Sequence, residues 1–285
     1  MTNSLADVLK EIDGIPVPNF VVTKVLELVN KPDVSALDLT ELIEKDPNLT
    51  VRIMKLANSS YYGLPQKITN LSHAIMILGF KTLRNLVVSV YTHDAFFSSK
   101  LETKNITEDE LWWHLVATAI ATEHVSTSVG YINKEEAFLA GMLHDLGKIV
   151  MAKLFPNYVD ALIILASKKS ITYVEAEKEM EFPDHVFIGK YLLEKWKFPQ
   201  IIQIPVAFHH DPGSVTEESF RDITYVVHSS DIISSILNQK AAGNYTLPIV
   251  KKEVWNYLKL NGTSFLDMIR STRDSMKKSD TFFKI

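Results

Sequence analysis

The chain has 285 residues, a mass of 32.3 kDa and 46% hydrophobic residues, a composition that excludes an intrinsically disordered protein. A formal net charge of −4 argues against general nucleic-acid binding, because it leaves no large basic surface. Cysteine is absent, so disulfides, thiolate nucleophiles and Cys-ligated metals are excluded, and a metal site must use His and carboxylate ligands.

Helix-start signals recur along the first third of the chain. Ser35 and Asp38 form a predicted capping box, and Asp46-Pro47 is typical of an N-cap followed by the first helical residue. Ser72 is predicted to cap the next helix, which Gly79 breaks or bends. The 10 Gly and 11 Pro residues are few for this length and also favour helices over a many-turned β-fold.

A polar, unpatterned segment at 96–107 predicts a boundary between two helical subdomains, 1–98 and 99–285. Thr107 and Glu110 form a second capping box, which opens a long helix. Asn133 and Glu136 repeat this pattern and are expected to open one helix that runs through His144-Asp145 to about residue 155. Further helices are expected after Pro183 and Pro199, from Phe220 to Leu237, and in the tail after Lys251. We therefore predict an all-α fold.

The N-terminus and the apolar runs indicate no membrane partner. The first residues, MTNSLADVLKEIDG, contain acids and no basic segment of the kind that precedes a secretory signal. Apolar runs such as 75–80 and 161–166 are far shorter than the roughly 20 residues of a membrane span. We expect a cytoplasmic protein.

The dipeptide His144-Asp145 is the first candidate for a metal site. It lies in the segment Leu143-His144-Asp145-Leu146-Gly147-Lys148, where apolar neighbours predict burial. A buried carboxylate is costly unless a cation or a hydrogen-bond donor compensates it. Adjacent helical residues point about 100° apart, so an imidazole and a carboxylate could lie on either side of one ion.

Other histidines have comparable settings. His114 lies beside small residues that allow close helix approach, and Gly189 leaves space beside His185. The pair His209-His210 ends a helix, and Asp231 lies in an otherwise apolar one. These residues could supply one or two divalent ions such as iron, manganese or zinc, or they could form a polar cluster around water. The predicted ligand set is His114, His144, Asp145, His185, His209, His210 and Asp231.

The chain resembles the HDOD family, the HD-related output domains of bacterial signalling proteins. The resemblance rests on Ile15-Pro16-Val17-Pro18, on 43–50 (IEKDPNLT), on 56–62 (LANSSYY) and on 72–79 (SHAIMILG), and it continues to His209-His210. It implies an all-α fold with two helical halves and a regulatory role in signal transduction. Most members of this family look like degenerate relatives of HD phosphohydrolases that have lost metal ligands.

The seven predicted ligands depart from that tendency. They resemble, position by position, the ligand set of HD-GYP phosphodiesterases, which bind two or three metals. The Gly-Tyr-Pro signature is missing, because Asp211-Pro212-Gly213-Ser214 follows the paired histidines, and this argues against cyclic dinucleotide hydrolysis.

Two functions follow from these patterns. The first is a signalling output protein that acts through an unidentified protein partner, and 57–64 (ANSSYYGL) is a candidate contact unless one of Tyr61 and Tyr62 packs inward. The alternative is a metal-dependent phosphohydrolase with a phosphoester ligand. In that case Asp145 would be shared by two ions, with His114, His144 and Asp231 chiefly on the first and His185, His209 and His210 on the second.

The remaining candidates have weaker settings. Lys148 could contact a phosphate oxygen, or it could be a solvated lysine near a helix end. His93-Asp94 has the same dipeptide as the main motif but lacks the Gly-Lys that follows it. His73 and His124 are expected to be structural, and His228 is expected at most to support Asp231.

Overall fold

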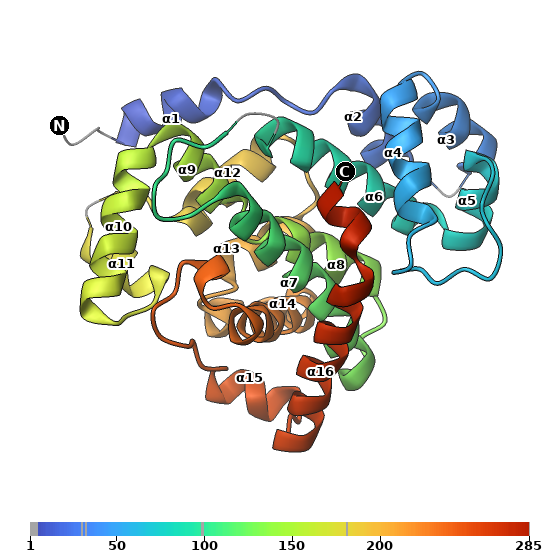
Figure 1. The fold of residues 1–285 in the computed structure, drawn as a ribbon. Coiled ribbons are helices and arrows are strands. Elements are labelled where there is room, and N and C mark those ends of the chain that lie inside the picture. Colours follow the sequence, from blue (N-terminus) through green and yellow to red (C-terminus); the bar gives the residue numbers. More distant parts are fainter. Residues whose placement is uncertain (1–4, 30, 32, 98–99, 181, 285) are drawn as a thin grey trace. The chain divides into compact units, whose positions relative to one another are not determined.

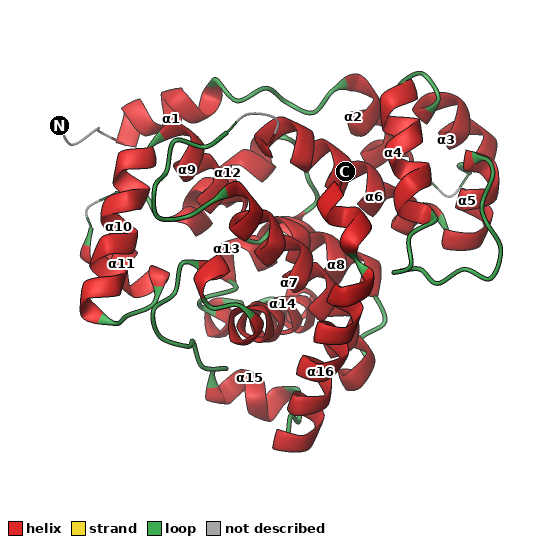
Figure 2. Cartoon of the chain, in the orientation of Figure 1, coloured by secondary structure: helices red, strands yellow, loops and turns green. Residues whose placement is uncertain are grey.

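A computed structural model describes residues 5–29, 31, 33–97, 100–180 and 182–284. Every regular element in these residues is a helix, which confirms the predicted all-α fold (Figure 2). Sixteen α-helices follow one another along the chain (Figure 1): α1 (Leu5–Asp13), α2 (Phe20–Leu28), α3 (Ala36–Ile43), α4 (Pro47–Ala57), α5 (Leu71–Leu78), α6 (Phe80–Phe97), α7 (Glu108–Val129), α8 (Lys134–Leu143), α9 (Leu146–Leu154), α10 (Pro156–Lys169), α11 (Tyr173–Glu179), α12 (His185–Lys195), α13 (Gln200–Phe208), α14 (Glu218–Leu237), α15 (Lys252–Tyr257) and α16 (Gly262–Lys278).

The chain forms two compact units. The smaller unit contains residues 17–98 and 274–285, and the larger unit contains residues 1–16 and 99–273. The boundary between the units near residue 98 falls in the polar segment noted in the sequence. Residues 1–16, however, belong to the larger unit and residues 274–285 to the smaller one, the reverse of the division made from the sequence. Lys195 of α12 fastens the N-terminal segment, because its Nζ donates to the carbonyls of Asp13 and Ile15 at 2.6 and 3.1 Å.

Capping side chains define the helices of the smaller unit. The capping box of Ser35 and Asp38 is present, and Asp46 accepts from the backbone N–H of Leu49 at 3.0 Å. The prediction for Ser72 is wrong, since Asn70 caps α5 two residues earlier by accepting from the N–H of His73 at 2.8 Å. Gly79 (φ 82°) lies between α5 and α6, where a left-handed backbone favours glycine.

The loop that follows α4 is closed by one amide side chain. Asn58 donates from Nδ2 to the carbonyls of Met54 and Ile68, both at 2.9 Å, and its Oδ1 accepts from the N–H of Ile68 at 2.8 Å. The ring of Tyr61 packs edge-on against Tyr62 and Phe282, with centroids 5.1 and 5.6 Å away. The Asn-Ser-Ser-Tyr-Tyr motif therefore organises the local fold of this unit.

The larger unit is built around α7, which packs against α8 and α14 (Figure 1). Thr107 and Glu110 form the predicted capping box of α7, and Gly130 (φ 74°) ends the helix. The Asn133 side chain, in contrast, makes no capping hydrogen bond at the start of α8. The predicted single helix through His144-Asp145 is wrong as well, because α8 ends at Leu143 and α9 begins at Leu146.

No single helix in the described part of the chain has both the length and the apolar character needed to cross a membrane. Two helix pairs have the required length and apolar character only when each pair is counted as one segment across a sharp bend. The bend is 119° between α5 and α6 and 116° between the α8–α9 segment and α10.

Gly147 gives the first testable prediction, because α9 and the start of α12 are in direct contact there. An added Cβ at Gly147 would lie 1.8 Å from the backbone oxygen of His185, a clash that no side-chain movement relieves. Gly147→Ala should therefore lower the free energy of unfolding by about 1–3 kcal/mol or more, measured by urea denaturation. Gly262→Ala is the matched control, since no atom lies within 4 Å of its added Cβ, and its effect should stay within about 0.5 kcal/mol. Equal stability of the two variants would contradict the close packing of α9 on α12.

Candidate metal centre

The structure brings all seven predicted ligand side chains together in the larger unit. Their ligating atoms form overlapping groups in which all atoms lie within 4.8 Å of one another. Six of the seven residues are buried, and the His210 side chain keeps 22% of its surface exposed. The side chains come from four helices and one turn: His114 (α7), His144 and Asp145 (the turn between α8 and α9), His185 (α12), His209 and His210 (the end of α13) and Asp231 (α14).

A glycine contact places the first two histidines. An added Cβ at Gly141 of α8 would lie 3.1 Å from the Cα of Ala119 and 3.2 Å from the carbonyl oxygen of Thr118, both on α7. The small residues around His114 therefore do allow close helix approach, as the sequence predicted. As a result, the Nε2 atoms of His114 and His144 lie 3.2 Å apart.

Asp145 lies between two groups of imidazoles. Its Oδ2 is 3.2 Å from His114 Nε2 and 3.3 Å from His144 Nε2. Its Oδ1 is 3.2 Å from His185 Nε2 and 3.6 Å from His209 Nε2. Each carboxylate oxygen thus faces a different pair of ring nitrogens, and the side chain is 2% exposed.

Asp231 and His210 complete the two groups. Asp231 Oδ1 lies 3.1 Å from His114 Nε2, on the side of the first pair. His210 Nε2 lies 3.1 Å from His185 Nε2, on the side of the second pair. The two groups also meet directly, since His210 Nδ1 is 3.8 Å from Asp231 Oδ2.

Outer hydrogen bonds hold the buried imidazoles in place through their Nδ1 atoms. His144 donates to the Gly141 carbonyl at 2.8 Å, and His209 donates to the Val206 carbonyl at 2.9 Å. His114 Nδ1 pairs with the Ser234 hydroxyl at 2.9 Å. These bonds leave Nε2 directed at the cluster, which is how proteins orient histidine ligands toward a metal.

Glu177 of α11 supports His185 and was not found from the sequence. Its Oε2 lies 2.7 Å from His185 Nδ1, and its Oε1 accepts from the backbone N–H of His185 at 2.9 Å. The residue is 4% exposed. The segment contains several acids, and sequence alone gives no sign that this one faces inward.

The donor atoms fit divalent ions on an independent observation. Asp145 Oδ1 and the Nε2 of His209 are buried, and among the described residues neither has a hydrogen bond of adequate geometry, whereas Asp145 Oδ2 is ion-paired with Lys148. Buried polar atoms are nearly always satisfied, so such a group points to an ion or another missing partner. Imidazole and carboxylate ligands suit iron, manganese or zinc.

Charge coupling within the cluster also matches a cation site. Burial raises the pKa of Asp145, but the charges of His144 and Lys148 outweigh it and hold that pKa well below its usual range. Burial lowers the pKa of His144, but Asp145 and Asp231 reverse this and raise it to about 9. Burial lowers the pKa of His209 to about 4. A metal ion bound here would have to displace the proton that the raised pKa keeps on His144.

Lys148 lies beside the cluster, and the alternative of a solvated lysine is wrong. The residue is 3% exposed, and its Nζ lies 2.7 Å from Asp145 Oδ2. The ammonium also contacts the Ala242 carbonyl at 3.4 Å and lies over the Tyr173 ring, 4.7 Å from its centroid.

The other histidines do not belong to the cluster of predicted ligands. His93-Asp94 lies in α6 of the smaller unit, where Asp94 pairs with Arg52. His73 and His124 belong to none of the clustered groups. His228 supports the cluster by a route that differs from the expected one, because its Nδ1 donates to the backbone carbonyl of His209 at 2.7 Å.

An all-helical fold that carries a buried cluster of imidazoles and carboxylates agrees with the family that the sequence resembles. The HDOD domain model matches residues 15–212, and the chain belongs to the HDOD family. This confirms the resemblance, including its extent from the early Ile-Pro motif to the paired histidines.

The chain is also similar to individual proteins. It is 25% identical over 218 residues to an uncharacterized protein of Treponema pallidum, a match that covers 76% of this chain and 42% of the relative. The chain spans less than half the length of the curated relatives it matches.

Three solved structures share the fold. An HDOD domain protein of unknown function from Geobacter sulfurreducens has a TM-score of 0.74 at 23% identity, covering 93% of this chain and 87% of that one. A candidate phosphohydrolase from Shewanella amazonensis has a TM-score of 0.73 at 22% identity, covering 96% and 97%. A candidate signal transduction protein from Marinobacter aquaeolei has a TM-score of 0.75 at 18% identity, covering 99% of this chain and 62% of that one.

Removal of one ligand tests the centre directly. His144→Ala removes an imidazole that faces both carboxylates, so metal affinity should fall by more than about 100-fold. Metal content per chain, measured by plasma mass spectrometry after anaerobic loading with iron and manganese, gives the result. His124→Ala is the control because it changes a half-buried histidine outside the cluster, on the same helix as His114, and this variant should keep its metal. A wild-type protein that takes up no metal would contradict the assignment.

Glu177 gives a graded prediction. Glu177→Gln weakens the acceptor that orients His185, so metal affinity should fall by about 10–100-fold while the fold is kept. Competition with a fluorescent chelator measures the affinity. Glu179→Gln, which changes an exposed residue of the same helix paired with Lys169, should leave the affinity unchanged. Equal affinities of the two variants would mean that Glu177 does not orient the ligand.

Proposed function

We propose that the protein is a metal-dependent phosphohydrolase of the cytoplasm whose centre lies in an HDOD domain used in bacterial signal transduction. One observation carries the proposal: the two oxygens of Asp145 face separate pairs of imidazole Nε2 atoms, His114 with His144 and His185 with His209. A carboxylate between two ligand groups is suited to bridging two ions. The name of the Shewanella amazonensis neighbour supports the same reaction class.

The ligand groups follow the two sides of Asp145. His114, His144 and Asp231 would hold one ion, and His185, His209 and His210 would hold the other, with Asp145 shared. When bound, divalent iron, manganese or zinc supplies the Lewis acidity that activates water and neutralises phosphate charge.

The reaction is hydrolysis of a phosphoester. The oxygen of a water molecule forms a new bond to phosphorus, the bond from phosphorus to the leaving oxygen breaks, and a proton passes from the water to the leaving oxygen. The chain's own part is to place the phosphate near Asp231 and His210 and to keep the remaining ligands buried. Lys148 does not line this pocket, but its fixed positive charge beside Asp145 would favour an anionic phosphate there.

A second function, regulation through a protein partner, has its own support. The chain covers only part of its longer relatives, and the Marinobacter aquaeolei neighbour is named for signal transduction. The Tyr61–Tyr62 segment is a candidate contact, although Tyr61 packs on Tyr62 and Phe282 within its own unit. In this case the ions would only hold the helices of the larger unit together.

Hydrolysis of bis(p-nitrophenyl) phosphate by the manganese-loaded protein tests the first function. Lys148→Met should lower kcat by about 100-fold, because it removes the positive charge beside Asp145 that favours the anionic phosphate, while metal content stays near that of the wild type. Lys153→Met, an exposed lysine of the same helix, should leave kcat unchanged. No turnover of this ester or of p-nitrophenyl phosphate by fully loaded protein would reject the hydrolase and favour the regulatory function.

A further inference from the structure

A pocket that is partly open to solvent lies beside the proposed metal centre. The pocket has a volume of about 480 Å³, and the ligands Asp231 and His210 form part of its wall. Pockets of this size hold small organic molecules rather than macromolecules. Any substrate that enters here reaches a ligand of each proposed ion.

A strap of chain, residues 244–251, forms another part of the pocket wall, and its middle is apolar between the polar lining residues Asn244, Thr246 and Lys251. Leu247, Pro248 and Ile249 all line the pocket. Leu247 is 48% exposed and Ile249 is 84% exposed, so both side chains are accessible to a ligand. Inorganic phosphate would gain nothing from these side chains, because its hydrated oxygens make no favourable contact with them.

Hydrogen bonds fix the strap at both ends. At its start, Asn244 Oδ1 accepts from the N–H of Tyr173 at 2.8 Å, and the N–H of Tyr245 donates to the Ile171 carbonyl at 3.2 Å. At its end, the N–H of Lys251 donates to His228 Nε2 at 3.1 Å. The apolar wall is therefore preformed, which reduces the entropy lost when a ligand packs against it.

We propose that the pocket selects small organic phosphates whose apolar or aromatic group packs on Leu247, Pro248 and Ile249 while the phosphate lies toward Asp231 and His210. The inference rests on the proposed phosphohydrolase function and names its substrate class. Burial of roughly 60 Å² of a phenyl group on these side chains corresponds to about a tenfold gain in affinity.

Two phosphonates that cannot be hydrolysed at the P–C bond test the inference by binding alone. Isothermal titration calorimetry on the manganese-loaded protein should show phenylphosphonate binding about tenfold more tightly than methylphosphonate. In the double variant Leu247→Ser and Ile249→Ser this ratio should fall below about threefold, because the phenyl group loses its apolar contact. Metal content and thermal unfolding of the variant verify that the strap and the centre remain folded.

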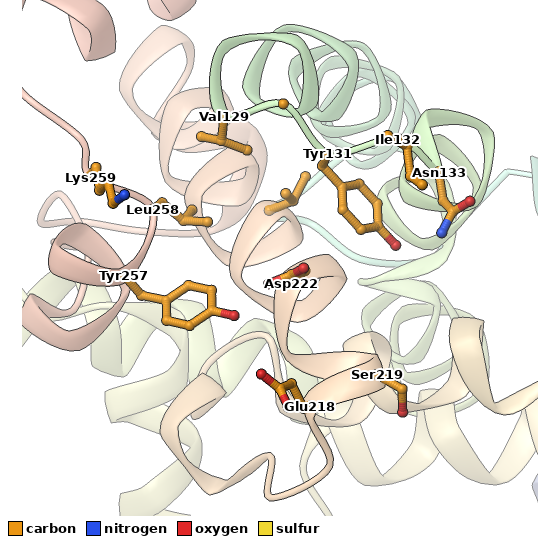
Figure 3. A pocket seen from close by; sticks show the side chains of 12 residues that line it. Val129, Tyr131, Ile132, Asn133, Glu218, Ser219, Asp222, Tyr257, Leu258 and Lys259 are labelled. Carbon is orange, nitrogen blue, oxygen red and sulfur yellow. The ribbon is translucent and has the colours of Figure 1, made fainter.

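Ile132→Ser is the matched control. Ile132 is 83% exposed and lines a separate pocket at the end of α7, together with Tyr131, Tyr257 and Asp222 (Figure 3). The variant should keep the tenfold ratio, since this pocket contains none of the proposed ligands.

The outcomes separate the two proposals. Equal binding of both phosphonates, absence of binding, or a ratio that survives the double substitution would overturn the substrate class, whatever the protein hydrolyses. A phenyl preference that depends on the strap would support the substrate class even if the loaded protein hydrolysed no ester, in which case only the phosphohydrolase function fails.

Discussion

The rest of the larger unit depends on one buried carboxylate. Asp145 lies almost entirely out of contact with solvent, where an uncompensated charge costs several kcal/mol or more. Compensation arrives from Lys148 on the next helix and from imidazoles on α7, α12 and α13. Those helices must therefore converge on Asp145, and this requirement determines how they pack in the larger unit.

These helices can converge only if their backbones approach one another unusually closely. Gly141 lets α8 approach the backbone of α7, and Gly147 does the same for α9 and the start of α12. Each glycine lies within three residues of His144 or Asp145 in the chain. The sequence around the dipeptide thus supplies both the polar groups and the space for their partners, so the segment acts as one structural unit rather than as two ligands on a scaffold.

Local rules predicted much of the fold, and chemical type predicted which polar side chains lie together in the cluster. The capping boxes of Ser35 and Thr107 depend only on neighbours in the chain, and both are present. The break between α8 and α9 could not be predicted, because nothing in the local sequence opposes a continuous helix there. Burial of Lys148 depends on Ala242 and Tyr173, which lie far from it in the chain. The inward position of Glu177 depends on its contact with His185, which belongs to the next helix. Sequence patterns identify which groups can interact, whereas the path of the chain decides which of them do.

The proposed ligands span the chain from residue 114 to residue 231, and this spacing has a consequence for stability. An ion held by side chains so far apart cross-links the folded unit and has no comparable site in the unfolded chain. With no cysteine available for covalent cross-links, free metal concentration would set how firmly the unit stays folded. By mass action, free ion at 100 times its dissociation constant adds about 2.7 kcal/mol for each site. A cell that is short of metal would then hold a protein that is more readily unfolded and degraded.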